Sequence, residues 1–198
     1  MRKKSHILLG RYLADQMSEV YSLQQHRKAF CLGNIMPDLK PSFLTTRHEF
    51  FGTFNQLQSN MRELVERSPE EENARVYWRR FGEVMHYMAD YFTFPHNRTY
   101  KGSLAEHNSY EAELKNRLKE CILSGRADSQ LEEAKHFDSF EELVEYIRER
   151  HTCYLESPRC IADDIRFILR VCYQVVQGIF QLCMRRQFHM EEQPLMVG

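Results

Sequence analysis

The chain has 198 residues, so a single domain with a sizeable core is the default expectation. Its hydrophobic content of 42% and charged content of 28% exclude a disordered or fibrous protein and describe an ordinary globular one. The formal net charge of −1 shows no excess of positive charge, and we therefore expect no stable nucleic-acid partner.

The chain shows no sequence signal for secretion or membrane insertion. Its basic start is followed by an apolar run of only Ile7 to Gly10, which is too short for the core of a signal peptide. No continuous apolar run reaches membrane-spanning length. Six cysteines in a chain without a signal peptide favour reduced thiols, and no C-x-x-C pair is present. Together these features predict a cytoplasmic protein without a transmembrane segment, and they leave its oligomeric state open.

Helical periodicity and capping signals account for most of the chain. Ser5 reads as the N-cap of the first helix, and Ser68-Pro69-Glu70-Glu71 is the strongest helix start. Expected helices cover residues 5–21, 23–32, 55–67, 69–92 and 104–123, with two more from Ser139 and from Pro158 onward. No stretch alternates like a strand, so the predicted fold is an all-α, multi-helix single domain over residues 1–198. We expect its tail, residues 191–198, to be disordered.

The strongest chemical signal is a set of two histidine–carboxylate pairs. His86 with Asp90, and His107 with Glu111, are each four residues apart, so on helices each pair lies on one face. His96 lies between the pairs, just after a proline that ends the helix containing His86 and Asp90. Imidazole nitrogens and carboxylate oxygens are the ligands of hydrolytic zinc sites, so this segment offers five candidate metal ligands.

Each pair alone is more typical of a solvated ion pair than of a metal site. The location of Asp90 favours metal, because it lies among apolar residues where an unpaired carboxylate is costly. A di-iron bundle is a weaker alternative, since it needs two Glu-x-x-His motifs and only Glu83 to His86 fits. The remaining histidines in polar surroundings are expected at the surface: His26, His136, His151 and His189.

An irregular turn is expected over residues 33–41, because its glycine and two prolines forbid a continuous helix. Such a turn can hold Asp38 at a fixed angle. His6 falls in the first turn of the first helix, and His48 lies shortly after the irregular turn.

The order of these residues resembles a known family. The motif H-x3-D-x5-H, with a proline before the third ligand, followed by H-x3-E, looks like the zinc-dependent phospholipase C family of bacteria, whose fold is related to that of single-strand-specific zinc nucleases. His6, Asp38 and His48 match family ligands in the same order. The resemblance covers roughly residues 5–115 and implies an all-helical domain with metals in a cleft.

The resemblance implies which residues hold each metal. One zinc would be held by Asp38, His48, His86 and Asp90. A second would be held by His96, His107 and Glu111. A third would be shared by His6 and Asp90. Family members complete this third site with an N-terminal tryptophan, whereas Trp78, the one tryptophan here, is expected in the middle of a helix. The expected cofactor is therefore two or three Zn²⁺ ions.

The implied activity is hydrolysis of a phosphodiester or phospholipid substrate by a phospholipase C-like phosphodiesterase. Clustered zinc offsets the substrate's negative charge and lowers the pKa of a bound water towards neutrality. Asp38 is the candidate catalytic residue, as the general base. The alternative is a non-catalytic helical protein that keeps the ligands for metal binding alone, and it would differ by a closed coordination sphere.

Overall fold

A computed structural model describes the backbone of residues 1–39, 49–158 and 160–192, and side chains up to residue 189. No strand occurs in these ranges, and the predicted all-α fold is confirmed. The α-helices are α1 (Lys3–Gln16), α2 (Tyr21–Gln25), α3 (Arg27–Gly33), α4 (Phe50–Glu66), α5 (Ala74–Tyr91), α6 (Leu104–Leu123), α7 (Phe140–Glu156) and α8 (Ile161–Glu192). Short 3₁₀ turns are η1 (Pro37–Leu39), η3 (Phe94–His96) and η4 (Asp128–Gln130).

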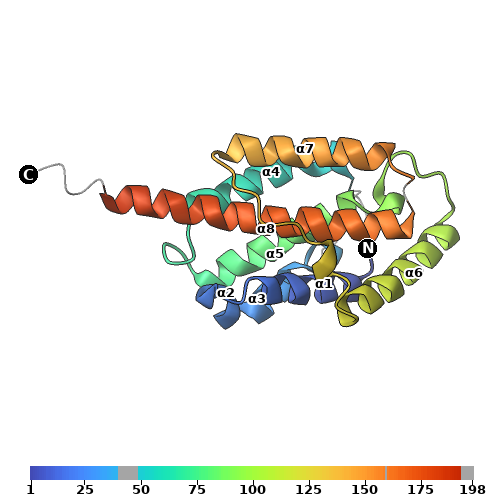
Figure 1. The fold of residues 1–198 in the computed structure, drawn as a ribbon, viewed down its shortest axis with the longest axis horizontal. Helices are drawn as coiled ribbons and strands as arrows, with labels where there is room; N and C mark the ends of the chain where they lie inside the picture. Colours follow the sequence, from blue (N-terminus) through green and yellow to red (C-terminus); the bar gives the residue numbers. More distant parts are fainter. Residues whose placement is uncertain (40–48, 159, 193–198) are drawn as a thin grey trace, which may run out of the picture.

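Helix α8 runs through the middle of the molecule and contacts α1, α4, α5, α6 and α7 (Figure 1). Its apolar side chains, including Ile168, Leu169 and Val175, are fully buried. The helices α4 and α7 lie along one side of α8, and α1, α3 and α5 lie along the other. The chain's first residue lies where α1, α5, α6 and α8 meet, so the amino terminus is inside the bundle.

By length and composition, Ile161–His189 of α8 could cross a membrane. The sequence hides this because polar residues such as Arg170 and Gln174 interrupt the apolar run. However, 61% of the helix's most apolar stretch is buried inside the protein, as in an ordinary core helix. The feature is therefore weak evidence for a membrane span.

Two glycines allow α3 and α5 to cross at close range. Gly33 and Gly82 face each other at the crossing, and a Cβ atom on Gly82 would overlap the carbonyl oxygen of Phe30. Only glycine permits such a close approach of two backbones. The crossing matters for the site, because it brings the end of α3 against the turn of α5 that contains His86.

Several helix boundaries differ from those expected. Helix α1 begins at Lys3, so Ser5 is buried inside it rather than capping it, and α1 ends at Gln16 rather than near Tyr21. The side-chain amide of Gln24 donates hydrogen bonds to the carbonyls of Ala14 and Met17, at 2.8 and 3.1 Å, and so satisfies the end of α1. The expected helix over 23–32 is divided at residue 26 into α2 and α3.

The expected helix start at Ser68 was wrong. Ser68 and Glu71 do exchange the two hydrogen bonds of a capping box, at 2.8 and 3.2 Å. The turn stops there, since Glu71 also pairs with Arg186 of α8, and α5 begins only at Ala74. Its cap is the side chain of Asn73.

Helix α8 extends into the tail expected to be disordered, residues 191–198, and this expectation stays a prediction. Helix α8 continues through Glu192, and the first proline after its start in the sequence is Pro194. The rest of this expected tail, residues 193–198, lies outside the described residues.

We predict that Gly82→Ala destabilises the protein by about 1–3 kcal/mol, because the added methyl group forces α3 and α5 apart. Gly52→Ala is the matched control. A Cβ there meets only the Glu49 side chain at 3.6 Å, so this change should be neutral or gain about 0.5–1 kcal/mol of helix propensity. Urea unfolding of both variants measures the difference, and equal stabilities would contradict the close crossing.

Candidate metal centre

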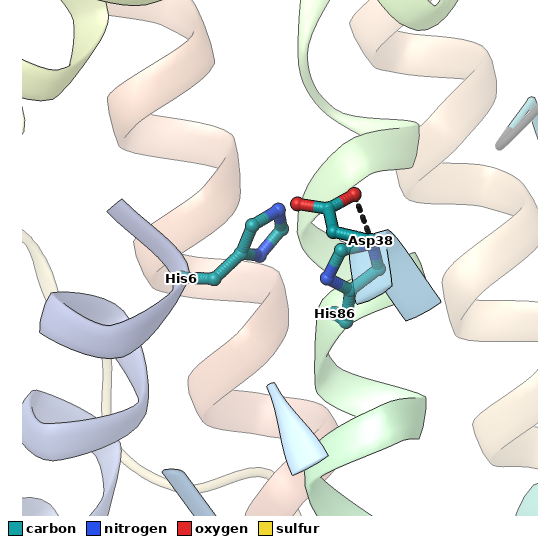
Figure 2. Close-up of side chains that lie close together, drawn as sticks. All are labelled: His6, Asp38 and His86. Carbon is teal, nitrogen blue, oxygen red and sulfur yellow. Dashed lines mark ion pairs between the residues drawn. The ribbon is translucent and has the colours of Figure 1, made fainter. Parts of the chain in front are cut away.

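The first cluster of ligand atoms gathers side chains from three separate elements. His86 extends from α5, His6 from α1 and Asp38 from the turn η1 (Figure 2). Their ligand atoms all lie within 4.8 Å of one another. The rings of His6 and His86 stack with their centroids 3.9 Å apart, and both are fully buried. Thus residues 80 positions apart in the chain form one pocket of metal-ligand type.

A second cluster combines η3 with the first turns of α6. It contains His96, His107 and Glu111, whose ligand atoms also lie within 4.8 Å of one another. The Oε1 atom of Glu111 lies 3.1 Å from His96 Nε2 and 3.2 Å from His107 Nε2. Ser103 begins α6 with a full capping box, which fixes the turn that presents His107.

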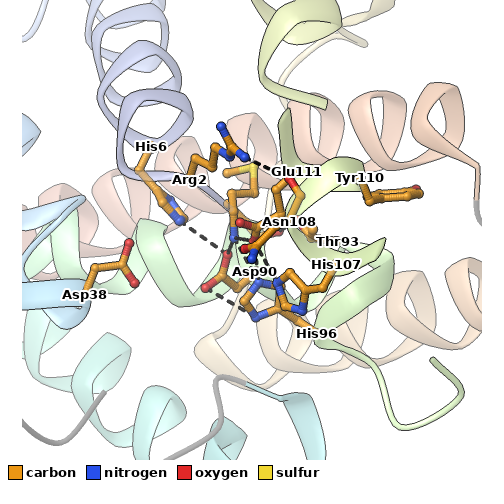
Figure 3. A network of polar contacts seen from close by, with 12 residues as sticks. Arg2, His6, Asp38, Asp90, Thr93, His96, His107, Asn108, Tyr110 and Glu111 are labelled. Carbon is orange, nitrogen blue, oxygen red and sulfur yellow. Dashed lines mark hydrogen bonds and ion pairs between the residues drawn. The ribbon is translucent and has the colours of Figure 1, made fainter. Parts of the chain in front are cut away.

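Asp90 lies between the two clusters (Figure 3). One carboxylate oxygen is 3.3 Å from His6 Nε2, and the other is 3.3 Å from His86 Nε2 and 3.7 Å from His96 Nδ1. The side chain is only 1% exposed, so its charge is not stabilised by bulk water. It is therefore placed to bridge two cations.

The tautomer of His86 is set by the backbone. Its Nδ1 lies 2.8 Å from the carbonyl oxygen of Asn34, which can only accept, so Nδ1 carries the proton. In the neutral ring, Nε2 then presents a lone pair to Asp38 Oδ1 at 3.6 Å and to Asp90 Oδ2 at 3.3 Å. Three electron-rich atoms repel one another unless a proton or a metal cation lies among them. A backbone carbonyl behind a histidine is also the usual support of a metal ligand.

His6 gives independent evidence that the donor set fits a metal. The ring is fully buried, and its Nδ1 has no hydrogen-bond partner among the described residues, while its Nε2 faces only the Asp90 carboxylate at 3.3 Å, without hydrogen-bond geometry. Burial, together with the neighbouring His86, lowers the pKa of His6 to about 3. Its imidazole is thus neutral and has a lone pair available at physiological pH, as metal coordination requires.

Two of the three carboxylates of the centre, Asp90 and Glu111, remain ionised. Burial raises the pKa of Asp90, but the histidines around it and the amino terminus outweigh burial and hold the pKa well below its usual range. The pKa of Glu111 is lowered by the hydrogen bonds from His107 and His96, again against burial. Negative charge is therefore concentrated in a site that only cations can neutralise.

The amino group of Met1 is one such cation, and sequence reasoning missed it. The nitrogen lies 2.5 Å from Asp90 Oδ1, 3.1 Å from Glu111 Oε1 and 2.9 Å from His96 Nε2. Burial lowers the pKa of this amine, but the two carboxylates raise it above its ordinary value. The five residues before His6 lead the backbone into the centre, a placement that no sequence motif signals.

Seven of the eight predicted ligands are brought into one centre: His6, Asp38, His86, Asp90, His96, His107 and Glu111. The eighth, His48, lies outside the described residues. The assignment of each residue to a particular zinc stays a prediction.

Comparison with known proteins agrees with this geometry. The model of a family described as zinc dependent phospholipase C matches residues 5–161. The chain belongs to this family. No curated protein and no solved structure gives a significant match. Membership in the zinc-dependent phospholipase C family thus rests on the family model, and it accounts for the histidine- and carboxylate-rich centre.

One expectation near the centre of this phospholipase C-family protein was wrong. His151 is not at the surface but 2% exposed, and it stacks on Phe50 with ring centroids 3.9 Å apart. Its Nε2 donates to the side-chain oxygen of Asn97 at 3.2 Å, since the amide nitrogen of Asn97 donates to Tyr91 and Thr93. The polar sequence around His151 belongs to the exposed face of α7, which hid its inward orientation.

This burial predicts a pH dependence of stability. Burial lowers the pKa of His151 to about 4, against the ordinary value of 6.5. The unfolded chain therefore takes up a proton below pH 6.5 that the folded chain refuses until about pH 4, so stability is lost as the pH falls through this window. We predict that His151 contributes about 2–3 kcal/mol to this loss.

The measurement is the free energy of unfolding of chelator-treated protein at pH 7.5 and 4.5, for wild type and His151→Gln. The comparison cancels the other histidines, which titrate in both proteins. The loss between the two pH values should be smaller in the variant by the stated amount. The same loss in both proteins would show that His151 is already protonated in the fold.

Proposed function

We propose that this protein is a zinc-dependent phosphodiester hydrolase of the phospholipase C type. One zinc would be held by Asp38, His86 and Asp90, with His48 as the further ligand that the resemblance implies. A second would be held by His96, His107 and Glu111. The proposal is supported above all by the buried carboxylate of Asp90, which two ligand clusters share.

The number of zinc ions depends on the amino terminus. A third zinc, shared by His6 and Asp90, would lie beside the Met1 amino group. As an ammonium this group competes with the metal for Asp90 and Glu111. Once deprotonated it becomes a nitrogen ligand, as the N-terminal residue is in the family. The proposal therefore includes a third ion that requires a free and neutral Met1 amine.

Bound zinc would supply Lewis-acid stabilisation of the phosphoryl oxygens and a water acidic enough to act as nucleophile near neutral pH. The protein's own side chains would then orient the attacking water and remove its proton. Asp38 lies on the 3₁₀ turn η1 and its side chain is 9% exposed, whereas that of Asp90 is 1% exposed. It is the carboxylate of the first cluster that solvent reaches more easily, and we propose it as the general base that accepts the proton of the attacking water.

The proposed substrate is a phosphodiester, either in a phospholipid headgroup or in a soluble molecule, and the proposed location is the cytoplasm. A phosphodiester has one negative charge. A centre in which the positive charge of the zinc ions exceeds the negative charge of the carboxylates would attract it. In the proposed hydrolysis, water would form the new bond to phosphorus and the P–O bond to the alcohol would break, giving a phosphomonoester and an alcohol, so no nucleophilic side chain is needed.

The test uses zinc-loaded protein with p-nitrophenylphosphorylcholine, bis(p-nitrophenyl) phosphate and phosphatidylcholine micelles. Chelation should abolish hydrolysis and added zinc should restore it. Asp38→Asn should lower kcat by about 100-fold or more, because a general base contributes on that order. Asp15→Asn is the control, since Asp15 is a surface residue paired with Arg27 and should retain full activity. Zinc-loaded protein that cleaves none of these substrates would favour the non-catalytic metal-binding alternative.

A further inference from the structure

Three hydrogen-bond donors converge on one buried carboxylate outside the metal clusters. Asp164, in the first turn of α8, is fully buried. Its Oδ1 accepts from the hydroxyl of Tyr154 at 2.7 Å. Its Oδ2 accepts from the hydroxyl of Tyr110 and from the backbone N–H of Phe94, both at 2.9 Å. No basic side chain pairs with Asp164 among the ion pairs found in the described residues.

The position of these donors along the chain is informative. Phe94 is the first residue of η3, two positions before the ligand His96. Tyr110 lies on α6, directly before the ligand Glu111. One carboxylate oxygen thus joins the two elements that together form the second cluster. The rings of Phe94 and Tyr110 also meet edge to face, with centroids 6.1 Å apart.

Asp164 and Tyr154 belong to α8 and α7, and α7 makes a further polar contact at the other end of η3. His151 of α7 binds the side chain of Asn97, the residue after His96. The α7–α8 pair therefore holds the short turn on both sides of the ligand, through Asp164 before it and His151 after it. By contrast, His86 of the first cluster is supported by the backbone carbonyl of Asn34, which follows α3.

We propose that Asp164 is a positioning residue for the metal site of His96, His107 and Glu111. It fixes the distance between η3 and α6, and so keeps His96 within reach of Glu111. This inference rests on the proposed zinc site, and it goes beyond family membership, because Asp164 lies after the matched residues 5–161.

A purely structural role is the competing explanation. Burying a carboxylate without a cation is costly, and burial raises the pKa of Asp164 to about 6 although its three donors oppose this rise. An apolar residue could fill the same volume at lower cost, but it could not bind a backbone N–H and a tyrosine hydroxyl at one point. The two roles differ in which metal site weakens when the carboxylate is removed.

The experiment measures zinc affinity by competition with a chelator, in protein that also contains Asp38→Asn so that the first site is weakened and the second is observed. Cobalt(II) absorption of the same proteins reports the geometry of that site. Asp164→Ala should weaken the second site by about 10-fold or more, since outer partners of metal ligands contribute on this order. The control is Asp163→Asn, at the neighbouring aspartate that pairs with Arg166 at 2.6 Å, and it should leave the affinity unchanged.

Two tyrosine variants keep the test decisive if Asp164→Ala does not fold. Tyr110→Phe removes the hydroxyl on the ligand-bearing helix α6, and Tyr154→Phe removes the one on α7, which has no ligand. Tyr110→Phe should weaken zinc binding at the second site and alter the cobalt spectrum, whereas Tyr154→Phe should lower only the melting temperature. Equal effects of the two variants on zinc affinity, or none from either, would overturn the positioning role while leaving the zinc site intact. Protein without Asp38→Asn that binds no zinc would refute the proposed function and, with it, this inference.

Discussion

The centre depends on one physical constraint: the carboxylate of Asp90 is buried and charged, and its charge must be compensated from within the protein. Four groups lie 2.5 to 3.7 Å from this carboxylate: the rings of His6, His86 and His96, and the amino group of Met1. None of these groups is a lysine or an arginine. The Met1 ammonium forms a salt bridge with Asp90. A neutral imidazole satisfies a carboxylate only with a proton or a metal between them, so the three histidines are suited to binding metal cations.

The helices supply this geometry through a few close contacts. Gly33 and Gly82 let α3 and α5 approach, which places the Asn34 carbonyl behind His86 and fixes its tautomer. Helix α8 lies at the centre of the bundle and, through Asp164, reaches the turn that contains His96. The first cluster is thus assembled by the N-terminal helices, and the second depends on the C-terminal pair.

Much of this was predictable from sequence, because helical spacing is local. The pairs His86–Asp90 and His107–Glu111 could be predicted from the i, i+4 spacing alone, and Pro95 predicts the end of the helix before it. What failed involved long-range contacts. Gln24 ends α1, Arg186 binds Glu71, and Phe50 stacks on His151, each across a separation that no local pattern reveals. The Met1 amine was missed for the same reason, since only the packing of α1 against α5 and α6 brings it to Asp90.

The most direct test of the shared carboxylate is a crystal structure of the zinc-loaded protein, with anomalous scattering recorded on both sides of the zinc absorption edge. The account predicts separate zinc peaks in the two clusters, one bound by His86 and Asp38 and the other by His96 and Glu111, with Asp90 between them. In Asp90→Asn crystals grown with the same zinc, both peaks should weaken. A single peak at the surface, or full occupancy in both clusters without the Asp90 carboxylate, would contradict it.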